Sequence, residues 1–179
     1  MLFEFRADVQ NLILTCGILY LELSICDLDE LQIDDFGLDS IDIVSPNHPE
    51  NYPDNEDCSI AIKVGAGRNL LLEILAFDVH EIAEICSMDF VQMYNGLPEN
   101  SVMPQDFPKM CGNFNELFEL PITDLTFSST GNSWFIRLVT DNRMNAGTGF
   151  KFRFSSIRKI FILTIVPRVT KILILNLIG

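Results

Sequence analysis

Four cysteines are the residues of this chain whose type and spacing most clearly predict chemistry. They are Cys26, Cys58, Cys86 and Cys111. Four cysteines can hold a structural zinc ion, but such sites usually contain closely spaced pairs, and the chain has no CxxC pair. The fifth cysteine, Cys16, lies apart from these in an apolar stretch near the start of the chain. If that stretch is removed, the four cysteines that remain in an exported domain predict disulfides instead, with three possible pairings. Sequential pairing, Cys26 with Cys58 and Cys86 with Cys111, would close two loops of medium length.

The remaining side chains give little support for catalysis. The chain has two histidines, His48 in a proline-rich turn and His80. It contains no histidine pair with metal-ligand spacing and no GxSxG, HExxH, P-loop or GxGxxG pattern. Serine and aspartate are abundant, so composition leaves a Ser/His/Asp arrangement open, but no pattern places such residues together. Cysteines held in disulfides are not nucleophiles. We therefore expect a protein that is not an enzyme.

Acidic residues dominate the central part of the 179-residue chain. Residues 26–156 contain 22 Asp and Glu against 7 Lys and Arg, a net charge of −15. A surface of this sign repels phosphate backbones, so we do not expect nucleic acid as a partner. It attracts cations and basic protein surfaces instead.

The first 25 residues differ from this acidic body. Residues 12–20 form an apolar run with the length of a signal-peptide core, too short to span a bilayer. Ser24 is a small residue that suits cleavage nearby. We expect residues 1–25 to be a signal peptide or another leader outside the domain. A buried extra strand and an incorrectly assigned first exon are the alternatives.

Residues 157–179 form a basic, apolar tail with 4 Lys and Arg and no acidic residue. As a membrane helix, the tail would place Arg168 and Lys171 near the bilayer centre, at about 2.5–3.5 kcal/mol each on insertion scales. A transmembrane span is therefore not expected. Contact of the tail with a membrane surface is an alternative to an extra strand, a loose tail or a read-through gene model.

Short strands separated by turns account for residues 26–156. Residues 58–64 alternate, with Ile60, Ile62 and Val64 on one face, and residues 149–155 place three phenylalanines on one side. Further strands are expected at 41–44, 69–79, 89–94, 124–129 and 133–140, with loops at 27–40 and 97–120. Many short strands without a repeated βα unit predict one antiparallel β-sandwich domain.

Residues 26 to about 156 resemble a CUB domain. The matching segments, in order, are Ser45-Pro46-Asn47 with Pro49, Tyr52-Pro53, Asp57-Cys58, Phe77-Asp78, Cys86 with Asp89, Cys111-Gly112, Ser129-Thr130-Gly131-Asn132, Thr140-Asp141 and Gly149-Phe150. Single pieces are common turn signals, but their order and spacing are specific. The resemblance implies an all-β, antiparallel jelly-roll sandwich with two sequentially paired disulfides in a secreted, extracellular protein.

A subset of CUB domains binds Ca²⁺ at one end of the sandwich, and the resemblance implies such a site here. The family's ligands are a Glu five residues before the third cysteine, an Asp three after it and an Asp in the last hairpin, supported by a Tyr. These positions hold Glu81, Asp89, Asp141 and Tyr52, and the Asn142 side chain can add an oxygen. Ca²⁺ takes roughly 6–8 oxygen ligands. The ion would relieve the repulsion between the three clustered carboxylates.

The resemblance implies a function in recognition. In Ca²⁺-binding CUB domains the ligand carboxylates commonly also receive a Lys or Arg of a protein partner. We expect a secreted, non-catalytic module that binds exposed Lys or Arg side chains of an extracellular protein through a Ca²⁺-organised site. The alternative is a regulatory CUB domain of an extracellular protease whose catalytic part lies outside this chain. Glycan or lipid-surface binding is a third reading.

Overall fold

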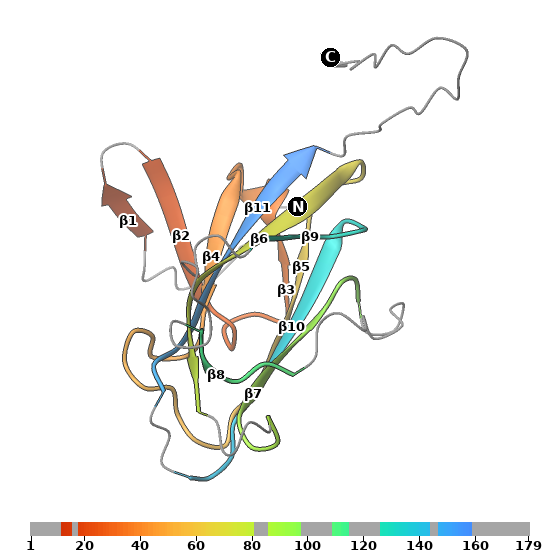
Figure 1. Cartoon of the computed structure of the whole chain (residues 1–179). Coiled ribbons are helices and arrows are strands. Elements are labelled where there is room, and N and C mark those ends of the chain that lie inside the picture. Colours follow the sequence, from red (N-terminus) through yellow and green to blue (C-terminus); the bar gives the residue numbers. More distant parts are fainter. Residues whose placement is uncertain are drawn as a thin grey trace, which may run out of the picture.

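The structure, a computed structural model, describes residues 12–15, 18–80, 86–97, 109–114, 126–143 and 147–158, with side chains from Leu21 onward except at positions 35 and 36. These residues form two β-sheets and one short 3₁₀ helix, η1 (Ile33–Phe36). Figure 1 shows the sheets as two layers of a sandwich, with the last strand in the middle of the larger sheet.

The larger sheet is built around two long antiparallel strands, β6 (Arg68–Val79) and β11 (Gly149–Arg158). Its order is β1 (Leu12–Thr15), β2 (Ile18–Ser24), β4 (Ser40–Val44), β11, β6 and β8 (Gly112–Asn113), and β9 (Thr126–Ser128) also pairs with β6. The smaller sheet has the order β3 (Glu30–Gln32), β5 (Asp57–Lys63), β10 (Ser133–Val139) and β7 (Phe90–Tyr94). Most neighbours are antiparallel, but β2 runs parallel to β4, and β3 runs parallel to β5.

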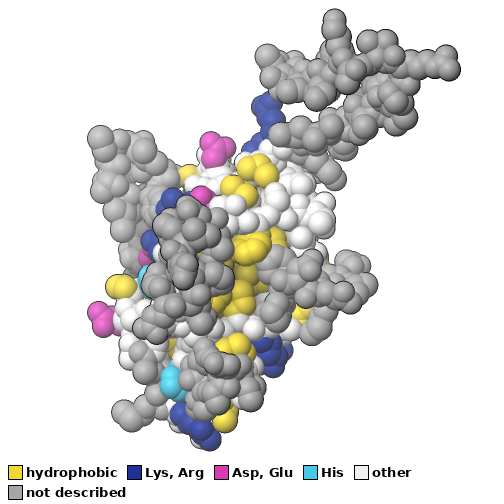
Figure 2. All heavy atoms as spheres, viewed as in Figure 1, with side chains coloured by type: hydrophobic (Ala, Val, Ile, Leu, Met, Phe, Trp, Pro, Cys, Tyr) yellow, Lys and Arg dark blue, Asp and Glu magenta, His cyan; other side chains and the backbone are white. Residues whose placement is uncertain are grey.

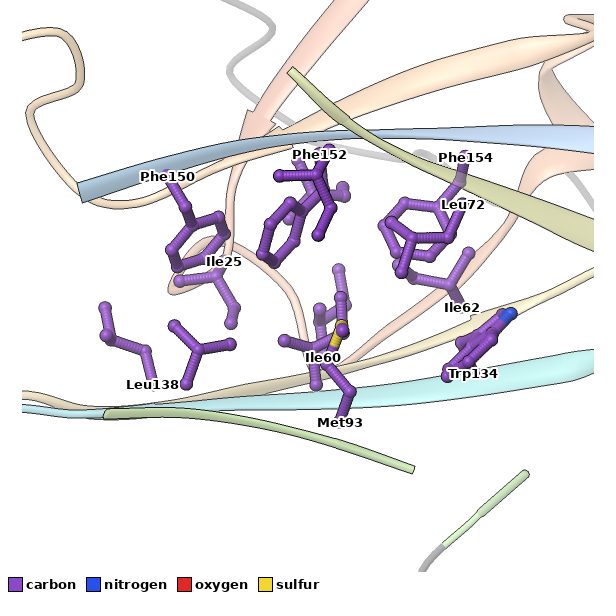
Figure 3. Packing of buried hydrophobic residues seen from close by; sticks show 14 of the residues in the cluster. Ile25, Ile60, Ile62, Leu72, Met93, Trp134, Leu138, Phe150, Phe152 and Phe154 are labelled. Atoms are coloured by element: carbon purple, nitrogen blue, oxygen red, sulfur yellow. The ribbon is translucent and has the colours of Figure 1, made fainter. Parts of the chain in front are cut away.

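The core lies between the two sheets. Phe150, Phe152 and Phe154 of β11 are fully buried and face Ile60 and Trp134 of the smaller sheet (Figure 3). The rings of Phe150 and Phe152 stack with their centroids 4.4 Å apart. Alternation along β5 and β11 places apolar side chains on the inner face of each sheet, as the sequence predicts.

A strand is present at each predicted position, and the differences are short or parallel elements that were not predicted. The loop expected at residues 27–40 contains β3 and η1, because three residues are enough to pair with β5 although they carry no periodic signal. Within the connection expected to be irregular, Met110 bridges to Val91 of the smaller sheet, and β8 then pairs with β6 of the larger one. This segment joins the two sheets along one side of the sandwich.

Both disulfides follow the sequential pairing. Cys26 is bonded to Cys58, and Cys86 is bonded to Cys111, with Cα separations of 5.1 and 5.4 Å. The first bond joins the residues after β2 to β5, and the second joins the segment before β7 to the bridging segment. Each closed loop removes conformations from the unfolded chain, which typically stabilises a domain by about 2–4 kcal/mol.

The outer face of the larger sheet carries an ion-pair network around a buried carboxylate. Asp42 of β4 has no exposed surface. Arg153 Nε lies 2.8 Å from Asp42 Oδ1, and Lys151 Nζ lies 3.2 Å from Asp42 Oδ2. The same ammonium lies 2.5 Å from Glu22 Oε2 on β2. Strands β2, β4 and β11 are therefore tied together by charge as well as by their backbones.

The predicted tail and leader are only partly covered by the structure. Strand β11 extends to Arg158, and the remainder of the tail and Cys16 lie outside the described residues. Strands β1 and β2 fall within residues 1–25, the segment expected to be a leader. None of the helices in the described part of the chain is long and apolar enough to cross a membrane.

Candidate metal and recognition site

The candidate site lies at the end of the sandwich where four loops meet. These are the turn after β4, the end of β6, the approach to β7 and the connection between β10 and β11, drawn at the lower end of Figure 1. Figure 2 shows Lys or Arg and His side chains exposed at this end of the molecule. The loops bring together residues from distant parts of the sequence.

Tyr52 and Asp89 form the buried centre of the site. The Tyr52 hydroxyl donates a hydrogen bond of 2.7 Å to Asp89 Oδ2 and accepts one of 2.8 Å from the backbone N–H of His80. Tyr52 is 2% exposed and Asp89 is 1% exposed. Burial raises the pKa of the Tyr52 phenol far above its ordinary value, with a further contribution from its hydrogen bond to Asp89. Tyr52 therefore acts as a neutral donor that positions the carboxylate.

Asp141 joins this centre through its backbone. Its N–H donates a 2.8 Å hydrogen bond to Asp89 Oδ1, so each oxygen of the Asp89 carboxylate has a protein donor. Its carbonyl accepts a bond of 2.7 Å from the N–H of Asn55. The preceding Thr140 accepts from the N–H of Glu56 and donates to the carbonyl of Pro53. These bonds attach the start of the β10–β11 loop to the Tyr52 turn.

The Asp141 carboxylate has a cation beside it. Arg143 donates its backbone N–H to Asp141 Oδ1 at 2.8 Å, and its Nε lies 3.6 Å from Asp141 Oδ2. The Asp141 side chain is 19% exposed, and that of Arg143 is 58% exposed. Both Asp141 oxygens therefore face the same residue. The guanidinium of Arg143 lies next to the Asp141 carboxylate.

Glycines allow the loops to pack this closely. A Cβ at Gly149, where φ is +80°, would lie 1.8 Å from the hydroxyl oxygen of Ser45 and 3.4 Å from the Tyr52 ring. That hydroxyl instead accepts the N–H of Phe150. A Cβ at Gly147 would lie 2.3 Å from the carbonyl oxygen of Asp78. The Ser-Pro-Asn turn, the end of β6 and the start of β11 meet here without room for side chains.

Asp78 is a positioning residue that the sequence prediction did not include in the site. Its Oδ2 accepts hydrogen bonds from the backbone N–H and the hydroxyl of Thr148, at 3.0 and 3.3 Å. On the other side, His48 Nδ1 lies 3.1 Å from the carbonyl oxygen of Thr148. The signal was available, because Asp78 belongs to the Phe77-Asp78 pair that contributes to the family resemblance. Spacing alone did not indicate what it would contact.

Of the predicted metal ligands, the structure brings Asp89 and Asp141 together, with Tyr52 bonded to Asp89 as expected of a supporting residue. Asn142 follows directly and is exposed. Glu81 lies outside the described residues, one position after His80, whose N–H is bonded to Tyr52. Coordination by these four residues stays a prediction.

The donor set suits a hard cation. Asp89 and Asp141 offer carboxylate oxygens only, and each oxygen with one hydrogen-bond donor keeps a second lone pair. Elsewhere in the part of the chain that the structure describes, one group of three residues has metal-ligand proximity: Cys26, Glu56 and Cys58. Its two sulfurs are bonded to each other and are therefore not thiolate ligands. The residues at the loop end fit Ca²⁺ better.

Relatives of the chain include cubilin and a zinc metalloproteinase. Residues 30–154 match the family model for the CUB domain. The chain is 36% identical to cubilin of Rattus norvegicus over 106 residues, which is 59% of this chain and 3% of cubilin. It is 32% identical to the zinc metalloproteinase nas-39 of Caenorhabditis elegans over 113 residues, which is 63% of this chain and 11% of that protein. The chain thus spans only a small part of these relatives.

Solved structures share the fold at low sequence identity. The full extracellular region of zebrafish Gpr126/Adgrg6 matches 73% of this chain with a TM-score of 0.56 and 22% identity, over 14% of its own length. The MASP-1 CUB2 domain bound to Ca²⁺ matches 71% of this chain with a TM-score of 0.53 and 20% identity, over 96% of its own length. The predicted β-sandwich with two disulfides and the predicted extracellular location are confirmed. By its sequence match and its fold, the chain belongs to the CUB domain family.

Proposed function

We propose that this CUB domain is a non-catalytic recognition module that binds Ca²⁺ at its loop end and there receives a Lys or Arg of an extracellular protein partner. The observation that supports the proposal most directly is the Tyr52–Asp89–Asp141 network. It holds a nearly inaccessible carboxylate next to a partly exposed one. Ca²⁺ supplies positive charge that organises carboxylates from separate loops. The likeness to a Ca²⁺-bound CUB2 domain agrees with the proposal.

Each residue has a distinct part in the proposed site. Asp89 is held in place by Tyr52 and by the Asp141 backbone, so it would contribute an oriented oxygen with little loss of side-chain freedom. Asp141 is more exposed and would contact both the ion and the partner. Glu81 and Asn142 would complete the oxygen shell from the adjoining loop positions. An acidic body would also speed encounter with a basic partner.

Calcium should raise the melting temperature of the full chain, and Asp141→Asn should abolish the rise. At a concentration about 100-fold above the dissociation constant, an ion that binds only the folded state stabilises it by about 2.7 kcal/mol. This corresponds to a rise of about 5–11 °C for a chain of this length. The measurement is differential scanning calorimetry in Ca²⁺ and in EDTA. Equal melting temperatures for the wild-type chain in the two buffers would reject the metal site.

Replacing Arg143 with glutamine should tighten Ca²⁺ binding by about 5–20-fold. The guanidinium beside Asp141 repels a divalent cation bound there, and charges a few ångströms apart at a protein surface interact by about 1–4 kcal/mol. The measurement is a calorimetric Ca²⁺ titration of the full chain at low ionic strength.

Arg137→Gln is the matched control for this experiment. Arg137 is also an exposed arginine paired with an aspartate, Asp57, but it lies on the outer face of the smaller sheet. Its replacement should change the Ca²⁺ affinity less than twofold after correction for net charge. Equal effects of the two substitutions would show that Arg143 acts only through the overall charge of the protein.

A second candidate function is a regulatory domain of an extracellular protease. Zinc metalloproteinase nas-39 and human tolloid-like protein 1 are among the relatives, and the chain spans 11% and 9% of their lengths. In this reading the domain positions substrate for a catalytic domain encoded in the same gene. Sequencing of transcripts across Ser156 discriminates, because a continuing reading frame with protease motifs supports a protease and an early stop opposes it.

A further inference from the structure

We infer that strand β2 (Ile18–Ser24) is a permanent strand of the folded domain and is kept in the mature protein. The sequence suggests a leader that ends near Ser24, and cleavage there would remove this strand. The family match begins at residue 30, so β2 lies upstream of the matched region. The inference concerns processing and does not depend on the proposed metal site.

Backbone pairing attaches β2 to the larger sheet. Glu22, Leu23 and Ser24 lie in parallel register with Asp42, Ile43 and Val44 of β4. The ladder continues past the strand, because the N–H of Ile25 donates a 2.9 Å hydrogen bond to the carbonyl of Val44. Figure 1 shows β2 beside β4, on the side away from β11. Without β2, residues Asp42, Ile43 and Val44 of β4 would lose their strand partner on this side.

Side chains of this segment also enter the core. Leu21 is 5% exposed, Ile25 is fully buried, and Leu23 packs against the core from a partly buried position. Figure 3 shows Ile25 pointing between the sheets beneath Phe150. Ile25 precedes Cys26, whose disulfide to Cys58 fixes the end of the segment to β5. A leader that is removed has no reason to supply core residues on alternate positions of a paired strand.

Charge joins β2 to the centre of the sheet. Lys151 Nζ of β11 lies 2.5 Å from Glu22 Oε2 and 3.2 Å from Asp42 Oδ2, so it spans from β2 across β4. Glu22 and Lys151 are both 25% exposed. Burial lowers the pKa of Lys151, but its hydrogen bonds to Glu22 and Asp42 outweigh this effect and raise the pKa above its ordinary value. The pairing therefore favours the charged ammonium.

Removal of β2 would leave a vulnerable edge. The backbone of β4 would present unpaired hydrogen-bonding groups, which in natural proteins promote association with other strands. Ile25 would become the first or second residue of the mature chain while still being required in the core. We therefore place any cleavage site upstream of Ile18.

The test is the N-terminus of the full chain after expression in a eukaryotic secretory system. Intact-mass measurement and N-terminal sequencing are applied to the disulfide-bonded product from both medium and cells. We expect the product to begin at or before Ile18, whether it is processed or not. A disulfide-bonded product that begins after Ile18 would overturn the inference.

Hydrogen exchange of the same product provides a second readout. The amide of Ile25 should exchange at least about 100-fold more slowly than in an unstructured peptide, because it is paired with Val44. The amide of Ala61, which bonds to Asp29 just before β3, the other parallel strand, is the matched reference. Exchange of Ile25 at the rate of an unstructured peptide, with Ala61 protected, would contradict a role of β2 in the fold.

Discussion

Replacing Asp42 with alanine should lower the free energy of unfolding by about 3 kcal/mol. Asp42 is fully buried on the outer side of β4, where Arg153 and Lys151 lie within 2.8 and 3.2 Å of its two oxygens. Removing one partner of a buried ion pair typically costs about 3–5 kcal/mol, because the remaining charge has lost its compensation. The lower value of this range applies here, because Arg153 and Lys151 are 32% and 25% exposed and stay partly hydrated. Urea unfolding at constant ionic strength measures the change.

Asp57→Ala is the control for this prediction. Asp57 also accepts two hydrogen bonds from an arginine, at 2.7 and 2.6 Å from Arg137, but both side chains are largely exposed. Pairs of this kind contribute only about 0.2–1 kcal/mol. Both sites pair an aspartate with an arginine, so the difference between the two losses in free energy of unfolding reports the effect of burial. Equal losses at the two positions would contradict the account of the outer face.

The second large effect is expected at Asp89. In EDTA, Asp89→Ala should lower the free energy of unfolding by about 2–4 kcal/mol, because one buried and one partly buried donor lose their acceptor. These donors are the Tyr52 hydroxyl and the backbone N–H of Asp141. Each buried donor left without a partner costs about 1–3 kcal/mol. Chemical unfolding in EDTA measures this loss of stability without a contribution from bound metal.

Asp141→Asn is the matched variant and should behave differently. An asparagine oxygen can still accept the N–H of Arg143, and the Asp141 backbone bonds do not depend on the side chain. We expect a loss below about 1 kcal/mol in EDTA, in line with a surface ion pair. A loss at Asp141 as large as at Asp89 would show that the two carboxylates do not have the separate roles proposed here.

Local periodicity was enough to predict the strands that have one buried face. Residues 58–64 and 149–155, which include most of β5 and β11, alternate in sequence, and their inner apolar side chains such as Ile60 and Phe152 are buried. Strand β3 is three residues long and runs parallel to β5, so its existence depends on a partner distant in sequence. Strand β2 falls in the expected leader because it overlaps the apolar run of residues 12–20, which has the length of a signal-peptide core. Composition alone does not distinguish a strand of the folded domain from a signal-peptide core.

The candidate site was predicted from family spacing, and its contacts required the fold. Spacing identified Tyr52, Asp89 and Asp141, and the structure links these three residues through hydrogen bonds. The network around Asp42 was not predicted, because it depends on the register of β4 against β11. The same holds for Asp78, whose partner Thr148 is 70 residues away. Long-range register is the physical information that a local pattern lacks.

The most direct test of the central claim is a calorimetric titration of Ca²⁺ into the metal-free full chain. If Asp89 and Asp141 belong to a Ca²⁺ site, the titration will show saturable binding of one ion per chain, and Asp141→Asn will remove it. Heats no larger than dilution, for a wild-type chain that is folded and has both disulfides, would contradict the proposal. Recognition would then have to involve another surface of this CUB domain.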